Sequence, residues 1–173
     1  MIETIRLEIV PATPALVHAA IQGHAALASE LAADVPSSWP PEYLDEDSLN
    51  FTLARFAEGD DQLGWWLHFV VLRRGFEPRT LIGSAGFCGR PTADGDVEVG
   101  YGIVSDRRRQ GFATEVVRAL VAHAFSYPSV RRVIAHTLPE LAPSIGVLEK
   151  CGFQLVDESP APGVIRFVLA RDA

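Results

Sequence analysis

The chain has 173 residues, of which 48% are hydrophobic and 21% charged, and its net charge is −7 at pH 7. This length suits one domain that folds unaided, and the composition is that of a globular protein. The negative charge argues against a nucleic-acid partner, because binding to phosphate backbones needs a basic face. No apolar run approaches the ~18 residues of a membrane span, and residues 1–11 lack the apolar stretch of a signal peptide. We therefore expect a cytoplasmic protein without a membrane partner.

The cysteine pattern argues against a metal site. Cys88 and Cys151 form no Cys-x-x-Cys pair and have no histidine at metal-ligand spacing. We expect two partly buried thiols in a reducing compartment, and no bound metal.

The first third of the chain predicts one strand and three helices. Residues 6–10 alternate polar and apolar side chains, as a strand does. The helices are marked by residue types that favour helix boundaries, which are Thr and Asp as N-caps, Pro in the first turn and Gly at the end. They are expected at residues 13–23, 24–33 and 45–59, with a proline-rich loop at 35–41.

After residue 60 the pattern changes to strands that alternate with helices. A long amphipathic helix is predicted from about Gly111 to Phe125, because its apolar residues recur at helical spacing. Pro143 and Gly152 mark the start and the end of a shorter helix. Strands are expected at 65–73, 80–88, 97–104, 132–137, 154–156 and 164–170. The order of the elements indicates one mixed α/β domain with no linker.

Residues 103–114 have the composition of an anion-binding loop, in which a strand ends, a basic turn follows and a long helix begins at a glycine. The first N–H groups of a helix lack intrahelical partners and lie at the positive end of its dipole, so they bind anions. Gly111 lets a phosphate approach the backbone closely. The chain has no P-loop sequence and no Gly-x-Gly-x-x-Gly after an early strand, which argues against those two nucleotide sites. A solvated basic turn is the alternative.

Residues 108–113, Arg-Arg-Gln-Gly-Phe-Ala, resemble the Gln/Arg-x-x-Gly-x-Gly/Ala pyrophosphate loop of the GNAT superfamily of acetyl-CoA-dependent N-acetyltransferases. The resemblance extends over about residues 60–157 and includes the segment Glu98-Val-Gly-Tyr101 ahead of the loop. Residues 144–153, Ser-Ile-Gly-Val-Leu-Glu-Lys-Cys-Gly-Phe, look like the ribosomal-protein-alanine acetyltransferase branch.

The chain departs from that branch in the segment before and after the serine. Leu141 stands where the branch usually has Asn, and Gly146 where it often has Arg. The Tyr that many members use as general acid is absent, since Val147 and Leu148 occupy that stretch.

The resemblance implies a single domain over residues 1–173, with the helical entry 1–59 on the acceptor side and an acetyl-CoA-binding core at 60–173. It implies an α/β (α+β) fold, with a mixed, mostly antiparallel sheet splayed around a cofactor cleft and helices on both faces. Acetyl-CoA would lie in that cleft as a co-substrate, without a metal. The residues expected to contact it are Ile103 and Val104 at the strand edge, then Arg108, Arg109, Gln110, Gly111, Phe112, Ala113 and Thr114.

Direct attack of an amine on the thioester needs a base for the ammonium proton and a donor for the departing thiolate. Glu98 is the candidate base, because two glycines alternate with it on its strand and leave room for a ligand. His136 on the next strand is the alternative base. Ser144, in the first turn of a helix, is the candidate on the thiolate side, with Tyr101 as the alternative donor. The tryptophans Trp39, Trp65 and Trp66 are expected mainly in the core, and Trp39, in the proline-rich loop, is the one that could instead line the acceptor pocket.

These features predict an enzyme, an acyltransferase that acetylates a primary amine. The amine is either a protein N-terminus or a small molecule, and the protein acts as a monomer or a homodimer. The alternative is a non-catalytic acyl-CoA-binding or regulatory module on the same fold, which Leu141 and the missing Tyr would favour.

Overall fold

The structure is a computed structural model, and it describes residues 1–73, 75, 78–156 and 161–171. The strands are β1 (Ile2–Glu3), β2 (Leu7–Pro11), β3 (Leu67–Leu72), β4 (Leu81–Phe87), β5 (Asp96–Ile103), β6 (Arg132–Thr137), β7 (Gln154–Val156) and β8 (Ile165–Ala170). The helices are α1 (Pro14–Gln22), α2 (His24–Leu31), α3 (Glu46–Phe56), α4 (Phe112–Phe125) and α5 (Ala142–Lys150), with two 3-10 turns, η1 (Asp60–Gln62) and η2 (Ser105–Arg107). Each helix and strand predicted above has its counterpart here. The additional elements, β1 and the two 3-10 turns, are too short to show a hydrophobic period.

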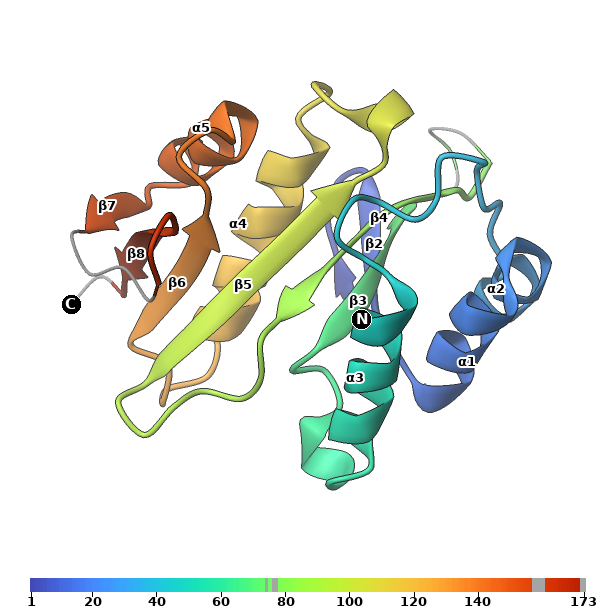
Figure 1. The fold of residues 1–173 in the computed structure, drawn as a ribbon, viewed down its shortest axis with the longest axis horizontal. Coiled ribbons are helices and arrows are strands. Elements are labelled where there is room, and N and C mark those ends of the chain that lie inside the picture. The colour runs from blue at the N-terminus through green and yellow to red at the C-terminus, as the bar shows by residue number, and fades with distance from the viewer. Residues whose placement is uncertain (74, 76–77, 157–160, 172–173) are drawn as a thin grey trace.

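The strands form one sheet in the order β1-β2-β3-β4-β5-β6-β8-β7 (Figure 1). β5 and β6 run parallel, and the other neighbouring pairs run antiparallel. This confirms the predicted mixed, mostly antiparallel sheet.

Capping residues explain where the N-terminal helices begin. The hydroxyl of Thr13 accepts the N–H of Leu16 at 3.2 Å, and the carboxylate of Asp45 accepts the N–H of Ser48 at 2.9 Å. Each side-chain oxygen replaces an intrahelical partner that the first turn lacks. By contrast, α4 follows Gly111 and has no side-chain cap.

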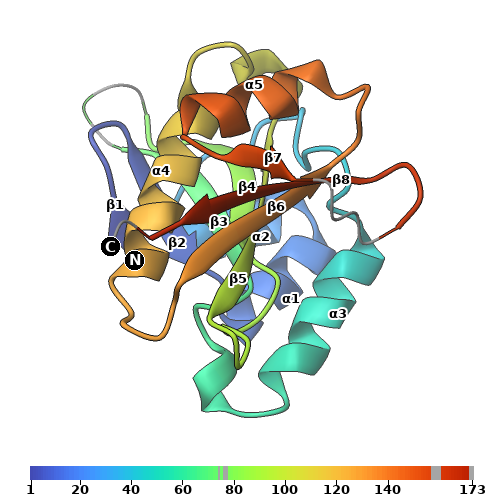
Figure 2. The same ribbon diagram turned by 90° about the vertical axis from the view of Figure 1, so that its left-hand side faces the viewer.

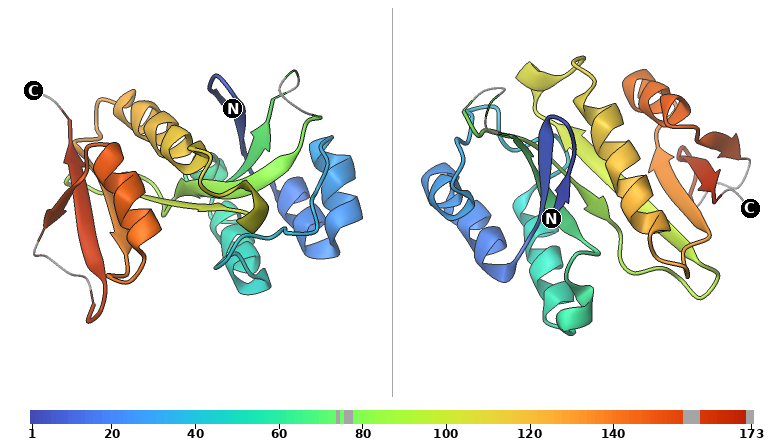
Figure 3. Two further views of the ribbon diagram at one scale, coloured as in Figure 1. Left: turned by 90° about the horizontal axis from the view of Figure 1, so that it is seen from above. Right: turned by 180° about the vertical axis from the view of Figure 1, so that it is seen from behind.

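Helices cover both faces of the sheet, as predicted (Figures 2 and 3). α1, α2 and α3 lie on one face, whereas α4 and α5 lie on the other, where α4 contacts β5 and α5 contacts β6. The core fills the space between these layers, and its largest fully buried side chains include Leu7, Ile9, Leu27, Phe69, Leu81, Ile82, Leu120 and Leu148. Within the described residues, no helix has the length and apolar character needed to cross a membrane.

β5 and β6 part from each other partway along their length. Their pairing runs from Asp96 with Arg132 to Glu98 with Ile134. Beyond Glu98, β5 continues to Ile103 beside β4, while β6 continues beside β8 (Figure 1). The second half of β5 therefore has no strand partner on its β6 side, which is the splay predicted for this sheet.

Candidate active site

The chain between β5 and α4 presents an uncapped helix N-terminus. After η2, Arg109 and Gly111 adopt left-handed backbone angles, with φ of 59° and 82°. α4 then begins at Phe112, and no side chain caps it. Left-handed residues in such a turn direct N–H groups to one side, which forms a concave anion site. Together with the dipole of α4, this arrangement suits phosphate oxygens.

The predicted loop residues differ in what they can offer a ligand. Arg109, Gln110 and Gly111 are exposed, and Ala113 is half-buried. The ring of Phe112 is buried in the core, so its backbone alone faces a ligand.

Arg108 is exposed but already engaged with the protein. Its Nε donates to the carbonyl of Ile103 at 3.0 Å, and its Nη2 pairs with the carboxylate of Glu42 at 3.0 Å. Glu42 directly follows the proline-rich loop before α3, so this ion pair joins the N-terminal helical segment to the predicted phosphate loop, residues 103–114.

The open edge of β5 is formed by Tyr101 and Ile103. In an antiparallel ladder, alternate residues turn their N–H and C=O groups away from the partner strand. The N–H of Val104 donates to Ile82 of β4 at 3.0 Å, and its C=O accepts from Arg107 at 3.0 Å. The backbone of Val104 is thus committed within the protein, whereas the N–H groups of Tyr101 and Ile103 face the side that β6 has left, where the Ile103 carbonyl already accepts from Arg108. Of the two predicted edge residues, Ile103 lies at the open edge, and Tyr101 rather than Val104 accompanies it.

Glu98 and His136 meet where β5 and β6 part. The Nδ1 of His136 lies 2.9 Å from the Oε1 of Glu98. The other ring nitrogen, Nε2, is buried and has no hydrogen-bond partner among the described residues. The Glu98 side chain remains 31% exposed, so it is the more accessible member of the pair. Sequence reasoning named the two groups as alternatives, and the fold brings them into contact.

Cys88 lies beside this pair. Cys88 is exposed, not partly buried as the sequence predicted, but desolvation by the surrounding protein, and secondarily the nearby Glu98 carboxylate, raises the pKa of its thiol to about 12. The thiol is therefore protonated at neutral pH, and it contributes no second charge beside Glu98.

Tyr101 and Ser144 meet on the opposite face of β5. The Tyr101 hydroxyl lies 3.2 Å from the Ser144 hydroxyl and donates to the Ser144 carbonyl at 3.2 Å. Burial raises the pKa of the Tyr101 phenol, and the hydrogen bond with Ser144 only partly opposes this. The phenol therefore keeps its proton at neutral pH and can donate it. Because successive strand residues point to opposite faces, Glu98 and Ser144 lie on different sides of β5.

Trp39 is not an open pocket wall. It is 7% exposed, and its ring lies 5.8 Å from that of Phe69, so it packs in the core. The N-terminal helical segment instead approaches β5 through Pro41, because a Cβ on Gly102 would lie 3.2 Å from the Pro41 Cβ. Gly100 has open space where its Cβ would be, on the face that carries Glu98.

The sequence did not indicate that Arg6 and Glu115 belong to the site. Arg6 contacts the phosphate loop, and its Nε donates to the Glu115 carboxylate at 2.7 Å. The two residues are 109 positions apart, so no local pattern could have linked them.

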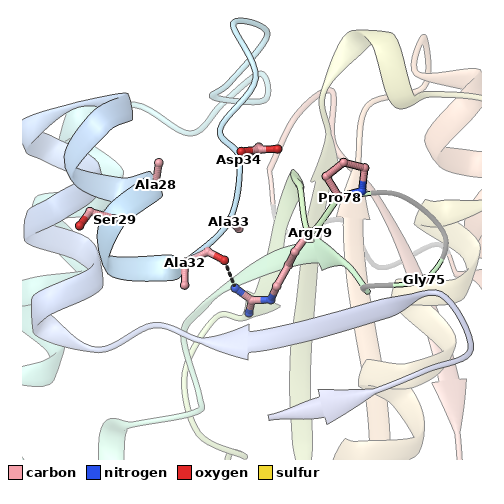
Figure 4. A pocket seen from close by; sticks show the side chains of 8 residues that line it. All are labelled: Ala28, Ser29, Ala32, Ala33, Asp34, Gly75, Pro78 and Arg79. Carbon is pink, nitrogen blue, oxygen red and sulfur yellow. Dashed lines mark hydrogen bonds between the residues drawn. The ribbon is translucent and has the colours of Figure 1, made fainter.

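Two hollows lie on the surface, one away from the loop before α4 and one beside it, lined in part by Gly111 and Thr114. One, of about 640 Å³, lies between the end of α2 and the start of β4, where Arg79 donates to the carbonyl of Ala32 at 3.0 Å (Figure 4). The other, of about 930 Å³, lies between the N-terminal hairpin and α4 and is bordered by Arg6 and Glu115. In the described part of the chain, no group of three His, Cys, Asp or Glu side chains could hold a metal ion.

Comparison with known proteins places these features in context. The family model of the acetyltransferase (GNAT) domain matches residues 6–154. N-acetyltransferase YjdG of Bacillus subtilis (strain 168), itself uncharacterized, is 28% identical over 146 residues, which are 84% of this chain and 84% of YjdG.

Solved structures share the fold. A protein assigned as a ribosomal-protein-serine acetyltransferase from Vibrio cholerae superposes with a TM-score of 0.68 at 19% identity, over 98% of this chain and 97% of that chain. Spermidine N-acetyltransferase from Vibrio cholerae, in complex with CoA and spermine, superposes with a TM-score of 0.63 at 15% identity, over 96% of both chains.

Proposed function

This chain belongs to the GNAT acetyltransferase family, and from that membership we propose that it transfers the acetyl group of acetyl-CoA to a primary amine. The observation that carries this proposal is the uncapped N-terminus of α4, which lies beside the unpaired edge of β5. The first feature suits a pyrophosphate, and the second suits an extended chain of amides. A phosphorylated donor with a pantetheine arm has both groups.

The donor is held mainly by backbone groups. N–H groups from Gln110 to Thr114 bind the pyrophosphate, and the guanidinium groups of Arg108 and Arg109 add charge-assisted hydrogen bonds. The pantetheine amides pair with the edge at Tyr101 and Ile103. This arrangement would place the thioester in the gap where β5 and β6 part, which is open to both faces of β5.

In the reaction, the amine nitrogen bonds to the thioester carbonyl carbon and the carbon–sulfur bond breaks. Glu98 takes the proton from the ammonium nitrogen, directly or through water, and His136 orients the carboxylate through Nδ1. Glu98 has this role rather than His136, because the free Nε2 of His136 is buried.

The departing thiolate takes a proton on the other side of β5. Ser144 lies in the first turn of α5, whose dipole favours developing negative charge. The Tyr101 phenol, in contact with Ser144, supplies a proton there, and the second proton that the nitrogen releases on becoming an amide returns to the phenolate through solvent. A strand residue thus provides the phenol that other family members carry on the helix.

The acceptor is a cationic amine, either a peptide N-terminus or a small molecule. The net charge of −7 attracts cations to the protein surface. The structural relative that was solved with spermine is consistent with this acceptor class.

The test is a thiol-release assay with a panel of amines, for the wild-type protein and Glu98→Gln. We expect the variant to bind CoA with unchanged affinity and to lose kcat by about 10²- to 10⁴-fold, the usual contribution of a positioned base. Glu30→Gln, an exposed carboxylate on α2, is the control. A wild-type rate in Glu98→Gln would remove Glu98 from the mechanism. Full CoA affinity without turnover on any amine would contradict the enzyme proposal.

A further inference from the structure

Arg6, in the turn between β1 and β2, contacts the phosphate loop at several points. Its Nη1 donates to the carbonyl of Gln110 at 3.1 Å, and its guanidinium lies 4.3 Å from the ring centre of Phe112. Its Nε donates to the Oε2 of Glu115 at 2.7 Å. One side chain from the far end of the chain therefore touches both the loop and the first turn of α4.

The carboxylate of Glu115 is enclosed by donors from the same turn. Besides Arg6 Nε, its Oε1 accepts the hydroxyl of Thr4 at 2.6 Å and the backbone N–H of Arg6 at 3.0 Å. Burial raises the pKa of Glu115, but these hydrogen bonds and the Arg6 charge outweigh burial and hold the pKa below its usual value. The group is thus an anion at neutral pH.

An anion at this position works against a phosphate site. Glu115 is four residues after Gly111 and lies in the first turn of α4. A free carboxylate there interacts with the same dipole as a bound phosphate and repels it. The paired Arg6 guanidinium offsets that charge within a salt bridge that is mostly buried, with side chains 33% and 19% exposed.

The hydrogen bond to Gln110 also sets the direction of a loop amide. In a trans peptide the C=O and the next N–H point in opposite directions. Because Arg6 holds the Gln110 carbonyl, the N–H of Gly111 points away from Arg6. Arg6 also lies close to Gly111 itself, since a Cβ at that position would be 3.5 Å from Nη2.

We propose that Arg6 is a positioning residue for the phosphate-bearing donor, which neutralises Glu115 and fixes the orientation of the loop amides. This inference rests on the proposed use of acetyl-CoA. It assigns a cofactor-related role to the N-terminal hairpin, which the motif of the phosphate loop does not include.

The experiment measures the Kd of CoA and of pantetheine, which lacks phosphates, for four proteins: wild type, Arg6→Ala, Glu115→Gln and the double variant. In Arg6→Ala the uncompensated Glu115 charge should raise the Kd of CoA about fivefold, the size of a charge effect at a helix terminus. The Kd of pantetheine should not change. The loss should shrink at high salt, because it is electrostatic.

The double variant separates charge compensation from simple support of the fold. With Glu115→Gln added, the repulsion disappears, so the double variant should bind CoA more tightly than Arg6→Ala does. If Arg6 only stabilised the fold, the double variant would bind CoA no more tightly than Arg6→Ala does.

Arg73→Ala is the matched control. Arg73 holds the same hairpin, since its Nη1 donates to the carbonyl of Thr4 at 2.7 Å and its Nη2 pairs with Glu3, and neither contact involves the loop. Unchanged CoA binding in Arg6→Ala, or equal losses for CoA and pantetheine, would overturn the proposal while leaving the acetyltransferase function intact. A wild-type protein that does not bind CoA would overturn both.

Discussion

The fold determines the protonation state of individual titratable residues, and His68 is the clearest case. His68 on β3 is 2% exposed, and its Nδ1 lies 3.0 Å from the carbonyl of Trp66. Burial lowers the pKa of His68 to about 4, and the hydrogen bond to Trp66 only partly opposes it. The imidazole is therefore neutral in the folded protein throughout the physiological range.

This shift predicts a loss of stability in mild acid. The unfolded chain binds a proton at His68 near pH 6.5, whereas the folded protein does so only near pH 4. The contribution of His68 to the free energy of unfolding is therefore fully present above about pH 6.5. It falls by about 3 kcal/mol as the pH drops toward 4. Urea unfolding at pH 7.5 and 5.0 measures it, and His68→Asn should flatten the dependence. His18→Asn, at an exposed position of α1, controls for the loss of an imidazole. An equally steep dependence in His68→Asn would show that other groups cause it.

At the scale of elements, local signals account for most of what the sequence could predict. The helix starts follow capping residues such as Thr13 and Asp45, and the strands follow apolar periodicity. The loop between β5 and α4 can be predicted as an anion-binding loop because its arginines and its glycine lie close together in the sequence. The contacts of Arg6 and Glu42 depend on tertiary packing, and the burial of Trp39 follows from the position of Phe69. None of these contacts is encoded in a short segment.

The ion pair between Glu42 and Arg108 links two loops and predicts a competition. In the proposed complex a pyrophosphate would compete with Glu42 for the Arg108 guanidinium, so Glu42→Gln should free this group and lower the Kd of CoA. The gain should be at most about fivefold, because the pair is exposed and such pairs contribute ~0–1 kcal/mol. Calorimetric titration with CoA measures it. Ser38→Ala, which removes a second link between the loops, the 2.6 Å bond from Ser38 to Asp106, is the control and should leave CoA affinity unchanged. A weaker affinity in Glu42→Gln would show that the carboxylate holds Arg108 in position.

At the scale of the whole molecule, the pairing of β4 with β5 joins the two halves of the sheet. One half carries α1–α3, and the other contains the gap where β5 and β6 part. β4 and β5 approach closely at Gly83, where a Cβ would lie 2.3 Å from the carbonyl oxygen of Gly102. The sheet can keep this spacing only while the position has no side chain.

Gly83→Ala should therefore destabilise the protein by about 1–3 kcal/mol, the usual cost of overpacking. Gly100→Ala on the adjacent strand is a matched control, because its Cβ would meet open space, and its stability should stay within about 0.5 kcal/mol of wild type. Thermal and urea unfolding measure both. Equal stabilities of the two variants would mean that the strands separate at little cost.

The parting of β5 from β6 also has a consequence for how the backbone exchanges hydrogen with solvent. The amides of Tyr101 and Ile103 face the side without a strand, although residues on both flanks are paired with β4. Protection from exchange follows hydrogen bonding, so these two amides should exchange deuterium faster than those of Gly102 and Val104. A donor that adds to this edge should slow the exchange of the same two amides. Deuterium uptake at single-residue resolution, with and without acetyl-CoA, would thus map the binding edge before any acceptor is known.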